Sequence, residues 1–124
     1  MTGRLLLILA LMALPAAPAR AIDSSVAFET ELSRLSEILG ALHHLRNLCG
    51  ANEGAKWRNE MQAILDAEGQ IPERRAKLIA SFNKGYRGFQ QTYRSCTPAA
   101  DTAIRRYLDE GAKIAREITA RYTN

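Results

Sequence analysis

Short motifs that mark catalytic and nucleotide-binding sites are missing from this chain of 124 residues. It contains no Gly-x-Ser-x-Gly, no phosphate-binding loop, no dinucleotide fingerprint and no His-Glu-x-x-His. It also lacks Cys-x-x-Cys-His, which excludes covalently attached c-type haem. Carboxylate pairs such as Glu60 with Asp66, or Asp109 with Glu110, are far more typical of charged helix surfaces than of a glycosidase. We therefore expect a protein that is not an enzyme and holds no cofactor.

Long hydrophobic runs are also scarce, and the unbroken run at Leu5–Leu14 has only ten residues. A bilayer-spanning helix needs about 20, so this run is too short to cross a membrane. A basic residue precedes it, a proline ends it, and Ala19–Ala21 has the small-x-small form of a signal-peptide cleavage site. We expect a signal peptide over residues 1–21 and a single domain over residues 22–124, with a retained N-terminal anchor as the alternative. Cleavage would leave no transmembrane segment and deliver the domain to the periplasm.

The excess of positive charge is small. Seventeen basic and thirteen acidic residues give a net charge of +4, and loss of Arg4 and Arg20 with the signal peptide would reduce it to +2. Such a balance gives little support for nucleic-acid binding, and export would separate the chain from nucleic acids. A mildly basic domain instead suits anionic envelope polymers or lipid head groups.

Cysteine is rare, and the two present are Cys49 and Cys96. In an oxidising compartment, two thiols are more typical of a disulfide than of metal ligation or nucleophilic attack. The two histidines, His43 and His44, are adjacent, so on a helix they point about 100° apart and chelate one ion poorly. The sequence therefore predicts a Cys49–Cys96 disulfide and no metal site.

Apolar residues recur at spacings of three and four, and nothing alternates with a period of two over a useful length. Caps and breakers delimit four expected helices, from Ser24–Ser25 to Cys49, from Asn52 to Gly69, from Pro72 to Cys96, and from Thr97-Pro98 to the end. Joined by short loops, they predict an all-α, up-down-up-down four-helix bundle. In that topology the first and third helices end at the same pole, which brings the two cysteines together.

The third expected helix carries aromatic residues along one face. They form a ladder of Phe82, Tyr86, Phe89 and Tyr93. Gly85 and Gly88 lie inside this ladder, although glycine costs up to about 1 kcal/mol in a helix interior. We expect the glycine pair to let a neighbouring helix approach closely, with a hinge or a ligand contact as the alternative.

The second expected helix is shorter than the others by about nine residues, which leaves about 14 Å of its neighbours uncovered. We predict a basic, partly apolar groove at the pole opposite the disulfide, suited to an acidic or amphipathic partner. The alternative is a solvated charged face with Phe28 folded over the gap. The candidate partner contacts are Trp57, Arg74, Arg75, Lys77, Arg87, Arg94, Arg116 and Arg121.

Several unusual strings cover nearly all of residues 22–124. They are Leu-Gly-Ala-Leu-His-His-Leu-Arg-Asn-Leu-Cys-Gly (39–50), Trp-Arg-Asn-Glu-Met (57–61), Phe-Asn-Lys-Gly-Tyr-Arg-Gly-Phe (82–89), Gln-Thr-Tyr-Arg-Ser-Cys-Thr-Pro-Ala-Ala (91–100) and Arg-Arg-Tyr-Leu-Asp-Glu-Gly (105–111). In these strings the chain resembles a family of small exported proteins of alphaproteobacteria. The resemblance implies a periplasmic domain of unknown function and assigns no functional residue.

Three functions are compatible with these features. The leading hypothesis is a periplasmic binding or adaptor module for an envelope protein or a cell-wall polymer, because arginine and tryptophan are enriched in binding hot spots. The second is a carrier of a small ligand or a metal that uses His43 and His44. The third is a periplasmic chaperone that cradles apolar chains.

Overall fold

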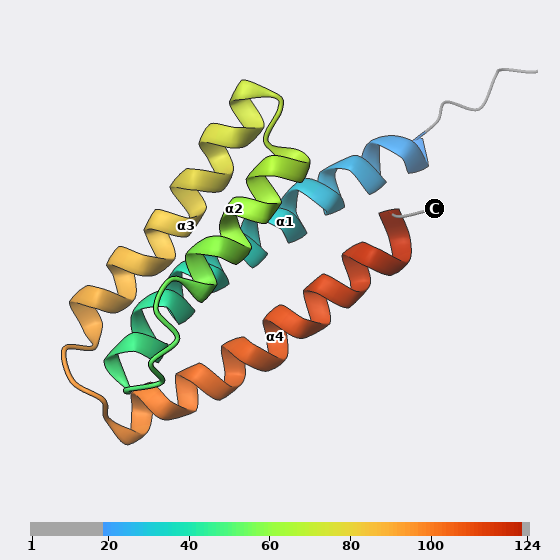
Figure 1. Ribbon diagram of the computed structural model, residues 1–124. Coiled ribbons are helices and arrows are strands. Elements are labelled where there is room, and N and C mark those ends of the chain that lie inside the picture. The colour runs from blue at the N-terminus through green and yellow to red at the C-terminus, as the bar shows by residue number, and fades with distance from the viewer. Residues whose placement is uncertain (1–18, 123–124) are drawn as a thin grey trace, which may run out of the picture.

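The structure, a computed structural model, describes residues 19–122 (Figure 1). Over these residues it contains no strand and four helices, α1 (Ala19–Leu48), α2 (Lys56–Glu68), α3 (Pro72–Thr92) and α4 (Pro98–Tyr122). Successive helices run in opposite directions, so the predicted up-down-up-down bundle is confirmed. Most of the predicted signal peptide lies outside the described residues.

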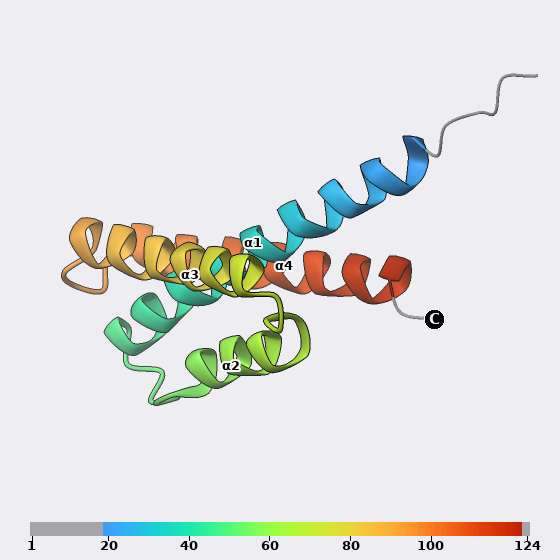
Figure 2. The ribbon, with the colours of Figure 1, turned by 90° about the horizontal axis from the view of Figure 1, so that it is seen from above.

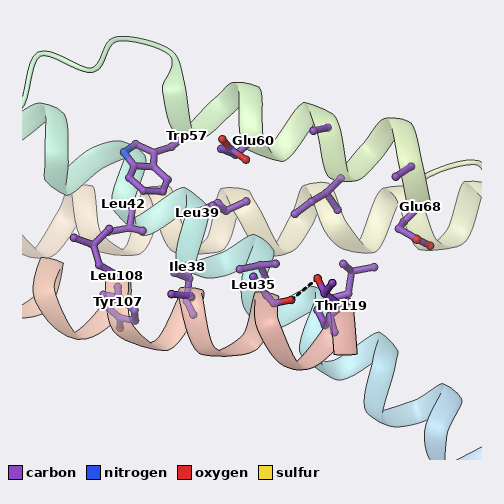
Figure 3. Close-up of a pocket in the computed structure, with 18 residues that line it drawn as sticks. Leu35, Ile38, Leu39, Leu42, Trp57, Glu60, Glu68, Tyr107, Leu108 and Thr119 are labelled. Carbon is purple, nitrogen blue, oxygen red and sulfur yellow. Dashed lines mark hydrogen bonds between the residues drawn. The ribbon is translucent and has the colours of Figure 1, made fainter. Parts of the chain in front are cut away.

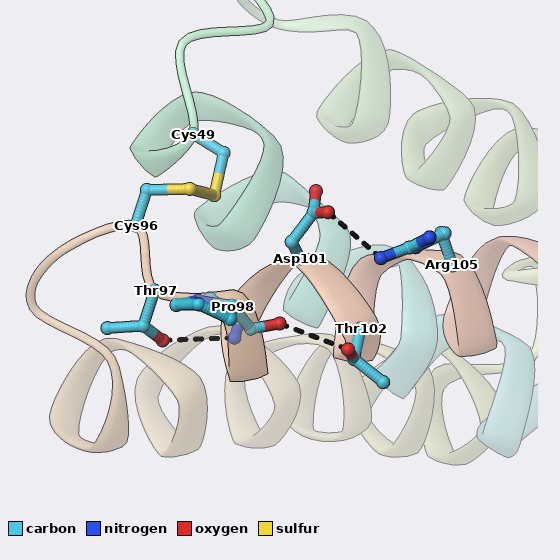
Figure 4. Close-up of polar contacts among 8 residues, drawn as sticks. Cys49, Cys96, Thr97, Pro98, Asp101, Thr102 and Arg105 are labelled. Carbon is cyan, nitrogen blue, oxygen red and sulfur yellow. Dashed lines mark hydrogen bonds and ion pairs between the residues drawn. A yellow bond between two sulfur atoms is a disulfide. The ribbon is translucent and has the colours of Figure 1, made fainter.

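Several helix ends follow the breakers in the sequence. Gly50, just after α1, has a φ of 74°, a left-handed conformation that glycine adopts without strain. Gly69 is the C-cap of α2, and Pro72 is the first residue of α3. At the start of α4, the Thr97 hydroxyl accepts a hydrogen bond from the Ala100 backbone N–H at 3.1 Å (Figure 4). This N-cap confirms the predicted start of the fourth helix.

Two predicted helix starts are wrong. The first helix begins at Ala19, upstream of the expected serine cap. The second begins at Lys56, because Asn52 and Gly54 have φ values of 51° and 57° and cannot continue a right-handed helix. The connection between α1 and α2 is therefore longer than expected, and α2 has 13 residues.

The third helix also ends earlier than predicted, and this changes the setting of the disulfide. Tyr93, at the C-cap of α3, already has extended backbone angles, so Cys96 lies in the loop leading to α4. The predicted Cys49–Cys96 disulfide is nevertheless confirmed, with the two Cα atoms 4.9 Å apart (Figure 4). It joins the ends of α1 and α3 near the start of α4, at one pole of the bundle.

The central helix is α1, whose backbone comes close to each of the other three helices. The backbone of α4 comes close to α1 alone, whereas α2 contacts both α1 and α3. In the view of Figure 2, α2 lies below the other helices. Because α2 leans on the α1–α3 pair, it is separated from α4 along the bundle.

This arrangement divides the hydrophobic core into two clusters, and α1 contributes to both. The first joins α1 to α4 through Ile38, Leu42, Leu45, Ala100, Ile104 and Ile114. The second joins α1 to α2 and α3 through Leu32, Leu39, Met61, Leu65 and Leu78. A helix that buries several sides must be apolar on several sides, as the middle of α1 is. Trp57 and Ile118 pack against both clusters.

The closest packing in the bundle is between α1 and α3, where two glycines face each other. A Cβ atom on Gly85 would lie 2.0 Å from the Glu37 carbonyl oxygen, and one on Gly40 would lie 2.0 Å from the Phe82 carbonyl oxygen. Gly85 therefore has the predicted close-approach role. Gly88 does not, because nothing lies within 4 Å of the position that its Cβ would take.

Candidate functional site

An apolar groove of about 530 Å³ lies between α2 and α4, with α1 as its floor (Figure 3). We call it the α2–α4 groove. The floor consists of Leu32, Leu35, Ile38, Leu39 and Leu42. The α2 wall consists of Trp57, Glu60, Ala63, Ile64, Ala67 and Glu68. The α4 wall consists of Tyr107, Leu108, Gly111, Ala112, Ala115, Ile118 and Thr119.

Small side chains keep this groove open. Ala63 and Ala67 of α2 lie on one side of the gap between the two helices, and Ala112 and Ala115 of α4 lie on the other. All four are exposed. Larger residues at these positions would fill the space between the two helices. A concave lining of this kind is suited to binding an apolar surface.

Trp57 lies near one end of the groove, and its indole is held by a polar network. The indole Nε1–H donates a hydrogen bond of 2.8 Å to the Glu53 carboxylate. The same carboxylate accepts two hydrogen bonds from Arg46 of α1, one of them from Nε at 3.1 Å. The Lys56 ammonium lies 5.0 Å from the centre of the indole ring. Trp57 is thus a half-buried aromatic wall with a fixed orientation, placed against the groove.

A comparison with protein families identifies the family of this chain. The model of a family described as "Protein of unknown function (DUF2385)" matches residues 27–122. The chain belongs to this family. The matched region contains both cysteines and every residue that lines the α2–α4 groove. No curated protein and no solved structure is significantly similar to the chain.

The DUF2385 family assignment confirms the resemblance to a family of unknown function. Within residues 19–122, no helix is both long and apolar enough to cross a membrane.

The groove of this DUF2385 domain differs from the basic groove that the sequence predicted. It extends along α2 instead of being restricted to one pole, and no basic side chain belongs to its lining. The difference arises because α2 leans toward α3, which opens the gap to α4 along the length of α2. Of the predicted partner contacts, Trp57 is the one that lines the groove.

The Arg74 side chain contacts residues of α1 and α2. Its guanidinium forms ion pairs with Glu29 and, at 3.3 Å, with Glu68, and it lies 5.5 Å from the centre of the Phe28 ring. Phe28 itself packs against the cluster that joins α1 to α2 and α3. Phe28, which the alternative interpretation places over the gap, does not belong to the lining of the α2–α4 groove.

The remaining basic candidates are not gathered into one site. Arg121 pairs with Glu31 at 3.1 Å and so links the end of α4 to α1. The others are exposed at different places on α3, α4 and the loop between them, namely Arg75, Lys77, Arg87, Arg94 and Arg116. Their role as partner contacts stays a prediction.

The two histidines lie on the side of α1 that faces α3. His44 Nε2 is 2.8 Å from the Tyr93 carbonyl oxygen, to which it donates a hydrogen bond. The His43 ring lies 5.4 Å from the Tyr86 ring, centre to centre. Among the described residues, no group of three or more His, Cys, Asp or Glu side chains is arranged to hold a metal ion.

The Arg46–Glu53–Trp57 network predicts a pH effect that the single tryptophan can report. Hydrogen bonding to Arg46, and more weakly to Trp57, lowers the pKa of Glu53 to about 2 from its usual 4.5. A depressed carboxyl pKa contributes stability that is complete above the unfolded-state value and is lost as pH falls toward the folded-state value. Between about pH 4.5 and pH 2, wild type should therefore lose more stability than Glu53→Gln, as measured by thermal unfolding.

Two observations check this assignment. The emission of Trp57 should change over the same acidic range in wild type, because protonation of Glu53 alters the acceptor of its indole N–H. In Glu53→Gln this change should be absent. If wild type and Glu53→Gln lost equal stability over this pH range, protonation of Glu53 would not be coupled to unfolding.

Proposed function

We propose that this protein is an exported, non-catalytic binding module, and that its α2–α4 groove takes an amphipathic helix of another cell-envelope protein. The observation that carries the proposal is the groove itself, an open apolar channel of about 530 Å³ in the middle of a small domain. Apolar surface of this kind is stabilised by removal from water. A partner that covers it would gain this stabilisation.

The shape of the groove favours a helix as its occupant. Its two walls are helices that run in the same direction, with alanines along their facing sides, so a third helix can approach both closely. The 13 residues of α2 span about 20 Å, which matches nearly four turns of a partner helix. A helix lying in a hydrophobic groove, with anchors spaced three and four residues apart, is a common mode of peptide recognition.

The charges at the groove indicate which helix would fit. The two charged residues in the lining, Glu60 and Glu68, are both acidic and both lie on α2. Glu68 pairs with Arg74, whereas Glu60 forms no ion pair with another described residue. The partner helix should therefore carry basic residues beside its apolar face, and an acidic amphiphile should be disfavoured. This reverses the charge of the partner that the sequence alone suggested.

Export and periplasmic location rest on two features of the chain. One is the signal-peptide pattern of residues 1–21, and the other is the disulfide, which is typical of oxidising compartments. A pre-formed apolar groove and the lack of a known catalytic motif support binding as the role of the domain.

A fluorescence titration tests the proposal, because Trp57 is the single tryptophan of the chain and lines the groove. The probe is a synthetic amphipathic helical peptide with leucines on one face and lysines beside them. We expect a saturable change in Trp57 emission. Affinity should be at least about tenfold weaker for the same peptide with glutamates in place of lysines, because unfavourable pairing with Glu60 costs on the order of 1.4 kcal/mol.

A matched pair of variants locates the binding surface on α4. Ala115→Phe fills the groove and should abolish the response, whereas Ala120→Phe, on an exposed position outside the lining, should bind as wild type does. Equal binding by both variants would exclude the groove as the site. Saturable binding of laurate or a neutral detergent, without peptide binding, would overturn the proposal in favour of a small-ligand carrier.

A further inference from the structure

A second pocket, of about 230 Å³, lies where α1, α2 and α3 meet. It shares no lining residue with the α2–α4 groove. Its lining consists of His43, Arg58, Phe82, Asn83 and Tyr86. We call it the His43–Arg58 pocket. Pockets for drug-sized ligands start at about 300 Å³, so this one suits a smaller molecule.

The polar groups of this pocket favour an anion. Its lining contains a guanidinium, an amide, a phenol and an imidazole, and no carboxylate. Arg58 forms no ion pair with any described acidic residue, which leaves its planar fork available. The guanidinium matches the geometry of a carboxylate, which it can bind through two parallel hydrogen bonds.

Rings from two helices form the rest of the pocket. The His43 ring lies 5.4 Å from the Tyr86 ring and 6.1 Å from the Phe82 ring, centre to centre, and is tilted by about 30° to each. The aromatic surfaces offer contact to a flat apolar group placed next to Arg58. The pocket therefore combines one cationic group with an aromatic wall.

The electrostatics of His43 reflect the positive charge of this pocket. Burial lowers the pKa of His43, and the positive charge of Arg58 and the neighbouring His44 lower it further. The Tyr86 ring of α3 and the Asn47 amide of α1, 3.5 Å from His43 Nδ1, also face it, and both charges that act on its pKa are positive. An anion bound by Arg58 would offset the repulsion and favour protonation of the imidazole.

We propose that the His43–Arg58 pocket binds a small organic carboxylate, with its carboxyl group on Arg58 and its flat apolar part against Phe82 and Tyr86. The ligand is either a free acid or the C-terminus of a peptide that ends in an aromatic residue. The site is separate from the α2–α4 groove, so either proposal can fail without the other.

The test is an NMR pH titration of the His43 imidazole with benzoate as the probe. We expect benzoate to raise the pKa of His43 saturably, by on the order of half a pH unit or more. In Arg58→Gln this shift should disappear, and the pKa without benzoate should be higher than in wild type. Arg75→Gln, which removes an exposed arginine outside the pocket, should respond to benzoate as wild type does. His44→Gln identifies which imidazole signal belongs to His43.

Three further probes complete the experiment. Benzyl alcohol should leave the pKa of His43 unchanged, and an equal shift would overturn the role of the carboxylate. Inorganic phosphate should act more weakly than benzoate, and an equal or larger effect would overturn the assigned ligand class. A short peptide ending in phenylalanine, compared with its C-terminal amide, distinguishes a chain terminus from a free acid. No saturable shift with either benzoate or the free-acid peptide would refute the site.

Discussion

Gly85→Ala is expected to lower the free energy of unfolding by about 2 kcal/mol. The added Cβ would lie 2.0 Å from the Glu37 carbonyl oxygen, which belongs to helix backbone and cannot rotate away. The α1 and α3 helices would have to separate, and overpacking of this kind typically costs about 1–3 kcal/mol or more. The higher helix propensity of alanine, about 1 kcal/mol, offsets part of the steric cost. Denaturant unfolding followed by circular dichroism measures the difference.

Gly88→Ala is the matched control, on the same helix and three residues away. Nothing lies within 4 Å of its added Cβ, so the substitution should stabilise the domain by up to about 1 kcal/mol. Gly40→Ala should resemble Gly85→Ala, since its Cβ would meet the Phe82 carbonyl oxygen at 2.0 Å. If Gly85→Ala and Gly88→Ala changed stability alike, the close α1–α3 contact would be refuted.

Removal of the disulfide is expected to have the larger effect. Cys49 and Cys96 are 47 positions apart, and the chain-entropy model assigns a loop of this size about 4 kcal/mol. The double variant Cys49→Ala/Cys96→Ala should melt lower than wild type by on the order of 20 °C, as measured by calorimetry. The disulfide also holds the start of α4 next to the end of α1. Among the helices, the backbone of α4 comes close to α1 alone.

Reduction of the wild-type protein provides the control for this prediction. The reduced protein should melt close to the double variant, because both lack the same cross-link. In the double variant itself, a reductant should have no effect. A loss of less than about 1 kcal/mol on removal of the bridge would mean that its closure adds little to the stability of the fold.

Much of the fold follows from local features of the sequence. Apolar spacing of three and four residues identifies the helices, and breakers such as Gly50 and Pro72 mark their ends. These signals work because they concern neighbouring residues, whose conformations are limited by their own backbone. The disulfide could be predicted because the chain has only two cysteines. The end of α3 could not, since no strong breaker stands between Gly88 and Cys96.

The candidate site was harder to predict, because periodicity shows that a face is buried but not which helix buries it. Ala112 and Ala115 of α4 are consistent with either a tight contact with α2 or an open groove. Likewise, the charge of Arg74 suggests a binding surface until its pairing with Glu29 is seen. A signal for the groove is present in the sequence, in alanines that occur at similar spacing on α2 and α4, but it has no meaning without their relative positions.

The helical class, the order of the helices and the pairing of the cysteines follow from the sequence, because each depends on local pattern or on the number of residues available. That α2 packs against α3 rather than against α4 depends on how the helices pack together. The middle of α1 is apolar on several sides and can accept neighbours in more than one arrangement. The arrangement observed is the one in which Gly40 and Gly85 let α1 and α3 come together most closely, and the α2–α4 groove is what remains.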